Sequence, residues 1–204
     1  MHKWPGVELG KFAIRSGPFF AASDFIEATI SGKGGHAAKP QETIDPTVIA
    51  SQIVVALQTI ASRRADPVKQ VVVSVTSFET SSNAFNVIPQ EVKIKGTVRT
   101  LDPEVRDLTE KEFLRITKLT AEALGGSADA KYTRGYPVMS NSDQQTEFAA
   151  KVARDVSGKC DEAPLVMGGE DFAYMLEERP GAYILIGNGD CLLYTSDAAD
   201  DRDS

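Results

Sequence analysis

The chain has 204 residues, of which 42% are hydrophobic and 25% are charged, and its formal net charge is −7. This composition is ordinary for a globular protein, and the length suits one large domain or one and a half ordinary ones. The acidic balance disfavours nucleic acid as a partner, because backbone phosphates are bound by clustered lysine and arginine. No apolar run approaches the roughly 18 residues of a membrane span, so we expect no membrane partner.

The first residues and the cysteines indicate a compartment. Residues 1–6 contain no apolar segment, so we expect no signal peptide. Cys160 and Cys191 lack the spacing of a metal or redox motif, and we expect no disulfide framework. A cytoplasmic location is the resulting expectation.

The elements predicted in chain order start with a short strand pair or extended segment over residues 6–21, divided by glycines and a proline. Residues 23–133 then alternate between strand and helix periodicity. Asp45-Pro46 and Asp102-Pro103 each predict a helix start, with Asp as the N-cap and Pro at the first helical position. The predicted strands cover 23–31, 70–78, 91–100 and 128–133. The order β-α-β-β-α-β is that of a ferredoxin-like domain.

Residues 134–190 show a different alternation. Helices are predicted from Asp143 or Gln144 to about Val156 and from Gly168 to Glu178, and a buried strand is predicted over 182–187. This segment is too short to close a sheet, as is the segment before residue 23. We therefore expect both to belong to one α/β domain, into which residues 23–133 are inserted.

The last fourteen residues, 191–204, form an acidic run without periodicity. They resemble the translation of a sequencing adapter fused in frame, and on that interpretation they do not belong to the fold. The alternative is a natural, disordered acidic tail.

A glycine-rich turn, Ser31-Gly32-Lys33-Gly34-Gly35-His36, follows the first strand of the inserted segment. Glycine tolerates positive φ, so we expect this turn to direct the histidine outward. Histidine changes charge near neutral pH and can donate a hydrogen bond to a developing anion. The glycines do not match the phosphate-binding motif G-x-x-x-x-G-K-[ST], so we expect no phosphate loop here.

Seven short motifs in a fixed order identify a family that the chain resembles. The motifs are Met1-His2-Lys3-Trp4-Pro5-Gly6, Gly34-Gly35-His36-Ala37-Ala38, Ile44-Asp45-Pro46, Asn86-Val87-Ile88-Pro89, Gly96-Thr97-Val98-Arg99-Thr100, Arg134-Gly135-Tyr136-Pro137 and Met167-Gly168-Gly169-Glu170-Asp171-Phe172. Over about residues 1–190 the chain resembles the metal-dependent amidohydrolases related to hippurate hydrolase, N-acyl-amino-acid amidohydrolase and the aminoacylase/glutamate carboxypeptidase group.

The resemblance implies a domain organisation. An α/β catalytic domain would hold two divalent metal ions, zinc, manganese or similar, and an inserted ferredoxin-like α+β lid would mediate homodimer formation. On this basis residues 1–22 and 134–190 are fragments of the catalytic domain and residues 23–133 are the lid. The family's N-terminal half, with its first metal ligands and its general-base glutamate, has no counterpart here, and no histidine follows Asp190. We therefore expect a fragment that binds no metal and is inactive by itself.

The resemblance also assigns roles to two histidines. His2 corresponds to a metal ligand, and its alternative is a disordered residue near the N-terminus. His36 corresponds to the lid histidine that reaches the partner subunit's active site and stabilises the tetrahedral oxyanion. The alternative for His36 is a residue that only caps the turn or the following helix.

Substrate contacts are expected at Asn86, Arg99, Gly168 and Gly169. The Asn86 amide could bind a carbonyl or carboxylate, although asparagine is also a common turn residue. The Arg99 guanidinium matches a carboxylate bidentately, with a surface ion pair as the alternative. The glycines resemble the loop that lines the active site, and they also suit a helix start.

The sequence thus predicts part of a hydrolase that cleaves the amide bond of an N-acyl amino acid or a related small amide by metal-activated water. The alternative is a stand-alone ferredoxin-like module for small-molecule binding or dimerisation.

Overall fold

The computed structural model describes residues 1–189, so the predicted tail at 191–204 lies outside the described residues. The described chain forms two compact units. The lid unit comprises residues 20–139 and 166–173, and the base unit comprises residues 1–19, 140–165 and 174–189. No helix within residues 1–189 combines the length and the apolar character that crossing a bilayer requires.

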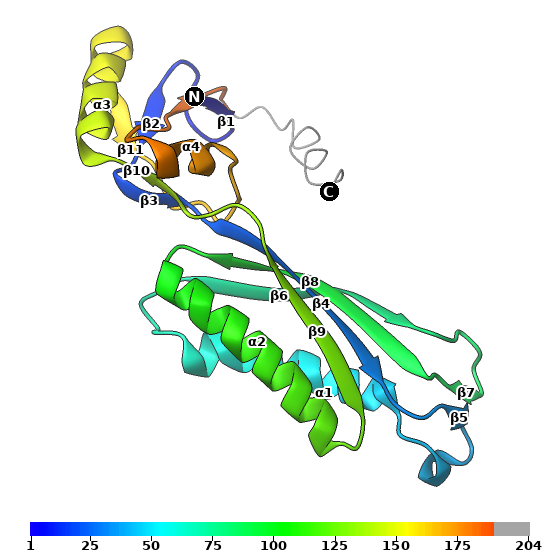
Figure 1. Ribbon diagram of the computed structural model, residues 1–204. Coiled ribbons are helices and arrows are strands. Elements are labelled where there is room, and N and C mark those ends of the chain that lie inside the picture. Colours follow the sequence, from blue (N-terminus) through cyan, green and yellow to red (C-terminus); the bar gives the residue numbers. More distant parts are fainter. Residues whose placement is uncertain (190–204) are drawn as a thin grey trace. The chain divides into compact units, whose positions relative to one another are not determined.

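The lid unit is built on an antiparallel four-stranded sheet in the order β6-β8-β4-β9 (Figure 1). Its strands are β4 (Ala22–Ser31), β6 (Val71–Thr80), β8 (Glu91–Thr100) and β9 (Ser127–Arg134). Helix α1 (Pro46–Thr59) connects β4 to β6, and helix α2 (Pro103–Ala123) connects β8 to β9. Both helices cover the same face of the sheet (Figure 1). This is the ferredoxin-like arrangement, and the predicted fold class is confirmed.

The two lid helices begin where their capping residues predict. The Asp45 carboxylate accepts a hydrogen bond from the Thr47 backbone N–H, and the Asp102 carboxylate accepts from the N–H groups of Glu104 and Val105. Helix α1 runs on into a π-helical turn, η2 (Ile60–Arg64). Between the helices and the sheet lies one apolar core. Its fully buried members include Ile30, Ile53, Leu57, Val92 and Phe113.

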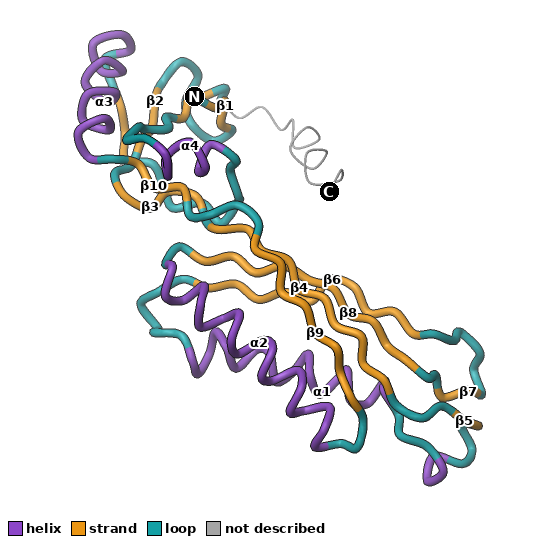
Figure 2. The backbone as a smooth tube through the Cα atoms, in the orientation of Figure 1, coloured by secondary structure: helices purple, strands orange, loops and turns teal. Residues whose placement is uncertain are grey.

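One end of the lid sheet carries a small extension that the sequence did not predict. Strand β5 (Gly35–His36) pairs antiparallel with β7 (Val87–Ile88), and the 3₁₀ turn η1 (Pro40–Glu42) lies beside them. Figure 2 shows β5 and β7 beyond the ends of β4 and β8. Strands of two residues have no periodicity, so pattern analysis cannot detect them.

The base unit contains a mixed sheet in the order β1-β12-β2-β11. Its strands are β1 (His2–Trp4), β2 (Phe12–Ile14), β11 (Cys160–Glu162) and β12 (Leu185–Gly187). Two further strands, β3 (Gly17–Phe20) and β10 (Met139–Asn141), pair with each other. The helices are α3 (Asp143–Ser157) and α4 (Phe172–Glu178).

The base elements differ from the predictions in their limits. The last strand is three residues long instead of six, α4 begins at Phe172 instead of Gly168, and β11 was not predicted. The Gly168 to Asp171 segment is a loop, and it belongs to the lid unit.

Candidate functional site

His36 lies in the extension at one end of the lid sheet, on β5 opposite Val87 of β7. Its side chain is exposed, and its Nδ1 accepts a hydrogen bond of 3.1 Å from the Ala38 backbone N–H. A neutral histidine that accepts at Nδ1 carries its proton on Nε2. His36 therefore makes a local hydrogen bond within its exposed turn, and it also offers an N–H donor on the other side of the ring.

The glycines before His36 are needed for close packing. None of Gly32, Gly34 and Gly35 has a positive φ, so the expected reason for glycine was wrong. A Cβ on Gly32 would lie 2.1 Å from the Ile44 carbonyl oxygen, and one on Gly34 would lie 2.8 Å from the Ile88 carbonyl oxygen. The turn approaches two other backbone segments too closely for any side chain.

Asn86 lies beside His36, although the two are 50 positions apart in the sequence. The Asn86 carbonyl oxygen accepts a 2.9 Å hydrogen bond from the Ala37 backbone N–H. The Asn86 side chain is exposed, and its amide has no hydrogen bond within residues 1–189. His36 and Asn86 together are called the tip cluster below. They present two hydrogen-bond donors at one end of the lid sheet.

Arg99 lies at the opposite end of the sheet, on β8 opposite Ser23 of β4. Its Nη1 donates a hydrogen bond to the Ser23 hydroxyl oxygen. In the described part of the chain no carboxylate lies within ion-pair distance of Arg99, so these residues do not supply the surface ion pair that was its alternative. A half-buried guanidinium without an acidic partner can bind an anionic ligand.

Gly169 contacts the Arg99 side chain from a segment 70 positions later. A Cβ on Gly169 would lie 2.7 Å from the Ser23 Cβ, 3.0 Å from the Tyr136 ring and 3.2 Å from Arg99 Nη1. Only glycine fits there without displacing a neighbour. Gly168 differs, because its Cβ would meet Val166 at an ordinary 3.5 Å. Arg99, Ser23, Tyr136 and Gly169 are called the arginine cluster below. Sequence analysis had assigned no role to Ser23 or Tyr136.

The tip cluster and the arginine cluster are far apart within one chain. Strand β4 runs from Ser23, beside Arg99, to Ser31, just before the glycine turn of His36. Eight residues of extended strand span about 26 Å. A small substrate therefore cannot touch both clusters of the same lid unit.

His2 lies in the base unit on β1, opposite Leu185 of β12. Its ring is half-buried, with ring centroids 6.1 Å from Trp4 and 6.4 Å from Tyr183. Within residues 1–189 no three His, Cys, Asp or Glu side chains are grouped closely enough to hold a metal ion. A divalent ion is held against water by several donors, so a metal site at His2 would need ligands in addition to this imidazole.

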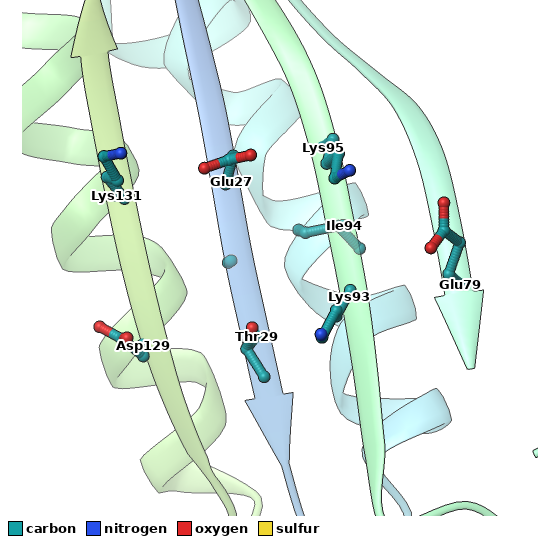
Figure 3. A pocket seen from close by; sticks show the side chains of 9 residues that line it. Glu27, Thr29, Glu79, Lys93, Ile94, Lys95, Asp129 and Lys131 are labelled. Carbon is teal, nitrogen blue, oxygen red and sulfur yellow. The ribbon is translucent and has the colours of Figure 1, made fainter. Parts of the chain in front are cut away.

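The open face of the lid sheet, opposite the helices, carries a shallow hollow between the two clusters (Figure 3). Glu27 lies there between Lys95 and Lys131 on the neighbouring strands. Charges of opposite sign alternate across the strands, which stabilises the sheet through cross-strand pairs. We interpret this face as solvated sheet surface.

The lid sequence matches a known protein family. Residues 23–123 match the family model described as a peptidase dimerisation domain. The chain is 37% identical over 187 residues to an N-acetyl-L-cysteine deacetylase of Bacillus subtilis, covering 92% of this chain and 45% of that protein. It is 37% identical over 202 residues to the hippurate hydrolase of Campylobacter jejuni, covering 96% of this chain and 52% of that protein.

A solved structure shows the same fold. The Bacillus subtilis protein described as a dinuclear metal binding peptidase from the M20 family is 29% identical, with a TM-score of 0.75, over 92% of this chain and 46% of that chain. The chain thus has the lid of a peptidase dimerisation domain, with flanking segments of the same fold as that peptidase. Residues 23–123 are the dimerisation domain of the M20 peptidase family, and the homologues of the chain are amidohydrolases and peptidases of that family. It spans about half the length of the curated relatives it matches.

Proposed function

We propose that the complete protein is a homodimeric amidohydrolase that cleaves the amide bond of N-acyl amino acids or related small amides. The relatives include enzymes named for deacetylation of N-acetyl-L-cysteine and for hydrolysis of hippurate, which are N-acyl amino acids. The arginine cluster supports this substrate class, because a guanidinium that has no acidic partner among residues 1–189 is suited to an amino acid carboxylate.

Two divalent metal ions, zinc, manganese or similar, are part of the proposal. A solved relative is described as a dinuclear metal binding peptidase. His2 would be one ligand, and the other ligands would come from parts of the complete protein outside this chain. Such ions lower the pKa of a bound water and so supply the attacking oxygen. The chain of 204 residues should therefore bind no ion tightly and should be inactive alone.

The residues of this chain would bind and stabilise the reacting molecule. The Arg99 guanidinium would hold the substrate carboxylate. The His36 Nε2–H and the Asn86 amide would donate hydrogen bonds to the oxyanion of the tetrahedral intermediate. Removing one such donor typically costs about 3 kcal/mol of transition-state stabilisation.

The distance between the two clusters carries the dimer proposal. Because about 26 Å of β4 separates them, His36 and Asn86 must act on a substrate held by the Arg99 of a second chain. A two-fold dimer contains two such shared sites. Residues 23–133 would be the lid that forms this dimer, and residues 1–22 and 134–190 would belong to the catalytic domain.

The test is hydrolysis of hippurate and N-acetyl amino acids by the complete protein, loaded with zinc or manganese, beside the 204-residue chain. We expect turnover by the complete protein and none by the chain. Absence of turnover of every N-acyl amino acid by the complete protein, or turnover by the chain alone, would contradict the proposal.

A further inference from the structure

Asp24 is a buried carboxylate that the proposed reaction does not use. Its side chain is 0% exposed, and Arg106 binds it through two N–H groups, with Nε donating to Oδ2 at 2.9 Å. The Tyr132 hydroxyl donates to Oδ2 at 2.7 Å, and the Gly135 backbone N–H donates to Oδ1 at 3.0 Å. A buried charge is tolerated only when it is fully paired in this way.

The partners of Asp24 come from separate parts of the lid unit. Asp24 is on β4, Arg106 on α2 and Tyr132 on β9, and these elements pack together (Figure 1). Arg106 also donates to the carbonyl oxygens of Gly135 and Tyr136, at 3.2 and 3.4 Å. Burial, together with the Asp24 carboxylate, raises the pKa of Tyr132 above its ordinary value, so its hydroxyl stays a donor. The network therefore fixes the start of β4 to the turn that follows β9.

The other face of the same two segments carries the arginine cluster. Side chains alternate along a strand, so Ser23 points to the face opposite Asp24. There the Ser23 hydroxyl accepts from Arg99, while its backbone N–H donates to the Tyr136 carbonyl oxygen at 3.0 Å. The Gly169 backbone packs against both Ser23 and Tyr136. Ser23 and Tyr136, the residues that position Arg99 and Gly169, thus lie on backbone segments that the Asp24 network holds from the opposite face of the sheet.

We propose that Asp24 is a positioning residue for the proposed carboxylate site. With Arg106 it fixes the backbone of Ser23 and Tyr136, and so holds the Arg99 guanidinium and the Gly169 segment ready for the substrate carboxylate. Preorganised groups bind more tightly because no ordering cost remains at the moment of binding. This inference rests on the proposed function, since it assumes that Arg99 binds the carboxylate.

Glu112 offers a matched control for the burial of a charge. It is 2% exposed, lies on α2, and pairs with Arg115 at 2.7 Å and Arg64 at 3.2 Å. None of its contacts within residues 1–189 involves the arginine cluster. Replacing Glu112 with glutamine removes a buried, arginine-paired charge of the lid unit, as Asp24→Asn does, but at a residue that has no hydrogen bond or ion pair to the arginine cluster.

The experiment compares Asp24→Asn and Glu112→Gln in the complete, metal-loaded protein. The substrates are N-benzoylglycine and its amide, which lacks the carboxylate. We expect both variants to lower the melting temperature. Asp24→Asn should raise KM for the acid by about tenfold, as expected for a weakened charge-assisted contact, and change KM for the amide less than twofold. Glu112→Gln should leave both KM values within about twofold of wild type.

The inference is overturned if Asp24→Asn changes both KM values equally, or neither. Should Asp24→Asn fail to fold, Ser23→Ala keeps the buried ion pair and removes the acceptor of Arg99, and it should give the same selective rise in KM. An unchanged KM for Ser23→Ala would then overturn the inference. Arg99→Lys distinguishes failure of the carboxylate site from failure of the positioning role. If Arg99→Lys does not raise KM selectively for the acid, the proposed carboxylate site itself is wrong. If Arg99→Lys raises it selectively and Asp24→Asn does not, only the positioning role is wrong.

Discussion

The two ends of the lid sheet present functional groups in different ways. At the tip, His36 is exposed on the two-residue strand β5 and Asn86 is exposed in the turn just before β7, and the tight glycine turn holds this end by backbone contacts. At the other end, Arg99 is half-buried and donates to Ser23, whose backbone is next to a buried ion pair on the opposite face of the sheet. The proposed function uses this difference, since the exposed tip would enter the site of a second chain and the arginine end would receive the ligand.

The largest effect is expected from Asp24→Ala. It leaves Arg106 and the Tyr132 hydroxyl buried without their acceptor, and breaking such a pair typically costs about 3–5 kcal/mol of unfolding free energy. Glu27→Ala, on the exposed face of the same strand, should cost less than about 1 kcal/mol. Urea unfolding of the 204-residue chain, followed by circular dichroism, measures both. Equal losses of unfolding free energy in the two variants would show that the buried and exposed faces of β4 do not differ in how much their charged residues stabilise the chain.

His36→Ala should affect activity and leave stability unchanged. The complete protein should lose about 10²- to 10³-fold in kcat, as expected when one oxyanion donor is removed. Unfolding free energy should change by less than about 0.5 kcal/mol, because the side chain is exposed. Lys39→Ala is the control in the same segment, since its ion pair with Glu42 is exposed. A kcat for His36→Ala that matches that of Lys39→Ala would exclude the catalytic role of the tip.

Gly169→Ala should have a smaller, local effect at the arginine end. The new Cβ would overlap Ser23 and press on Arg99, so we expect kcat/KM for an N-acyl amino acid to fall about tenfold in the complete protein. Gly168→Ala introduces the same methyl group at the preceding residue, where its contacts are at ordinary van der Waals distance. It should change kcat/KM less than twofold. If both variants lose kcat/KM equally, the contact between Gly169 and Arg99 is not the cause of the loss.

The smallest effect concerns pH. Arg115 and Arg64 lower the pKa of Glu112 below its ordinary value, and its burial opposes them only in part. A carboxylate with a lowered folded-state pKa contributes stability that is present above the unfolded pKa and is lost as pH falls through the folded one. The chain should therefore lose stability below about pH 4.3, and Glu112→Gln should flatten that part of the profile. Parallel pH profiles of wild type and variant, measured by urea unfolding, would contradict this assignment.

Much of the fold follows from the sequence, because its signals are local. Asp45-Pro46 and Asp102-Pro103 fix two helix starts, and alternation predicts β4 and β8 closely. The short strands β5, β7 and β11 were missed, since two or three residues contain no period. The π-helical turn after Thr59 likewise leaves no mark that separates it from an α-helix.

The candidate site was less predictable, because it depends on contacts between distant segments. The residues came from a family resemblance, and no spacing rule brings Gly169 to Arg99 or Asn86 to His36. Asp24 was not among the predicted site residues, although the alternation along its strand marks it. It stands in register with Ile26, Ala28 and Ile30, so the alternation places a charge on the core face of β4. A charge at a core position requires a partner, so this pattern predicts a buried network around Asp24.

The most direct test of the shared site mixes two inactive variants of the complete protein. His36→Ala and Arg99→Ala homodimers should each be nearly inactive. Unfolding and refolding them together in equal amounts should restore about a quarter of wild-type activity on hippurate, because half of the dimers are mixed and each mixed dimer has one intact shared site. Activity no higher than the sum of the separate variants would show that each chain completes its own site, and would contradict the account.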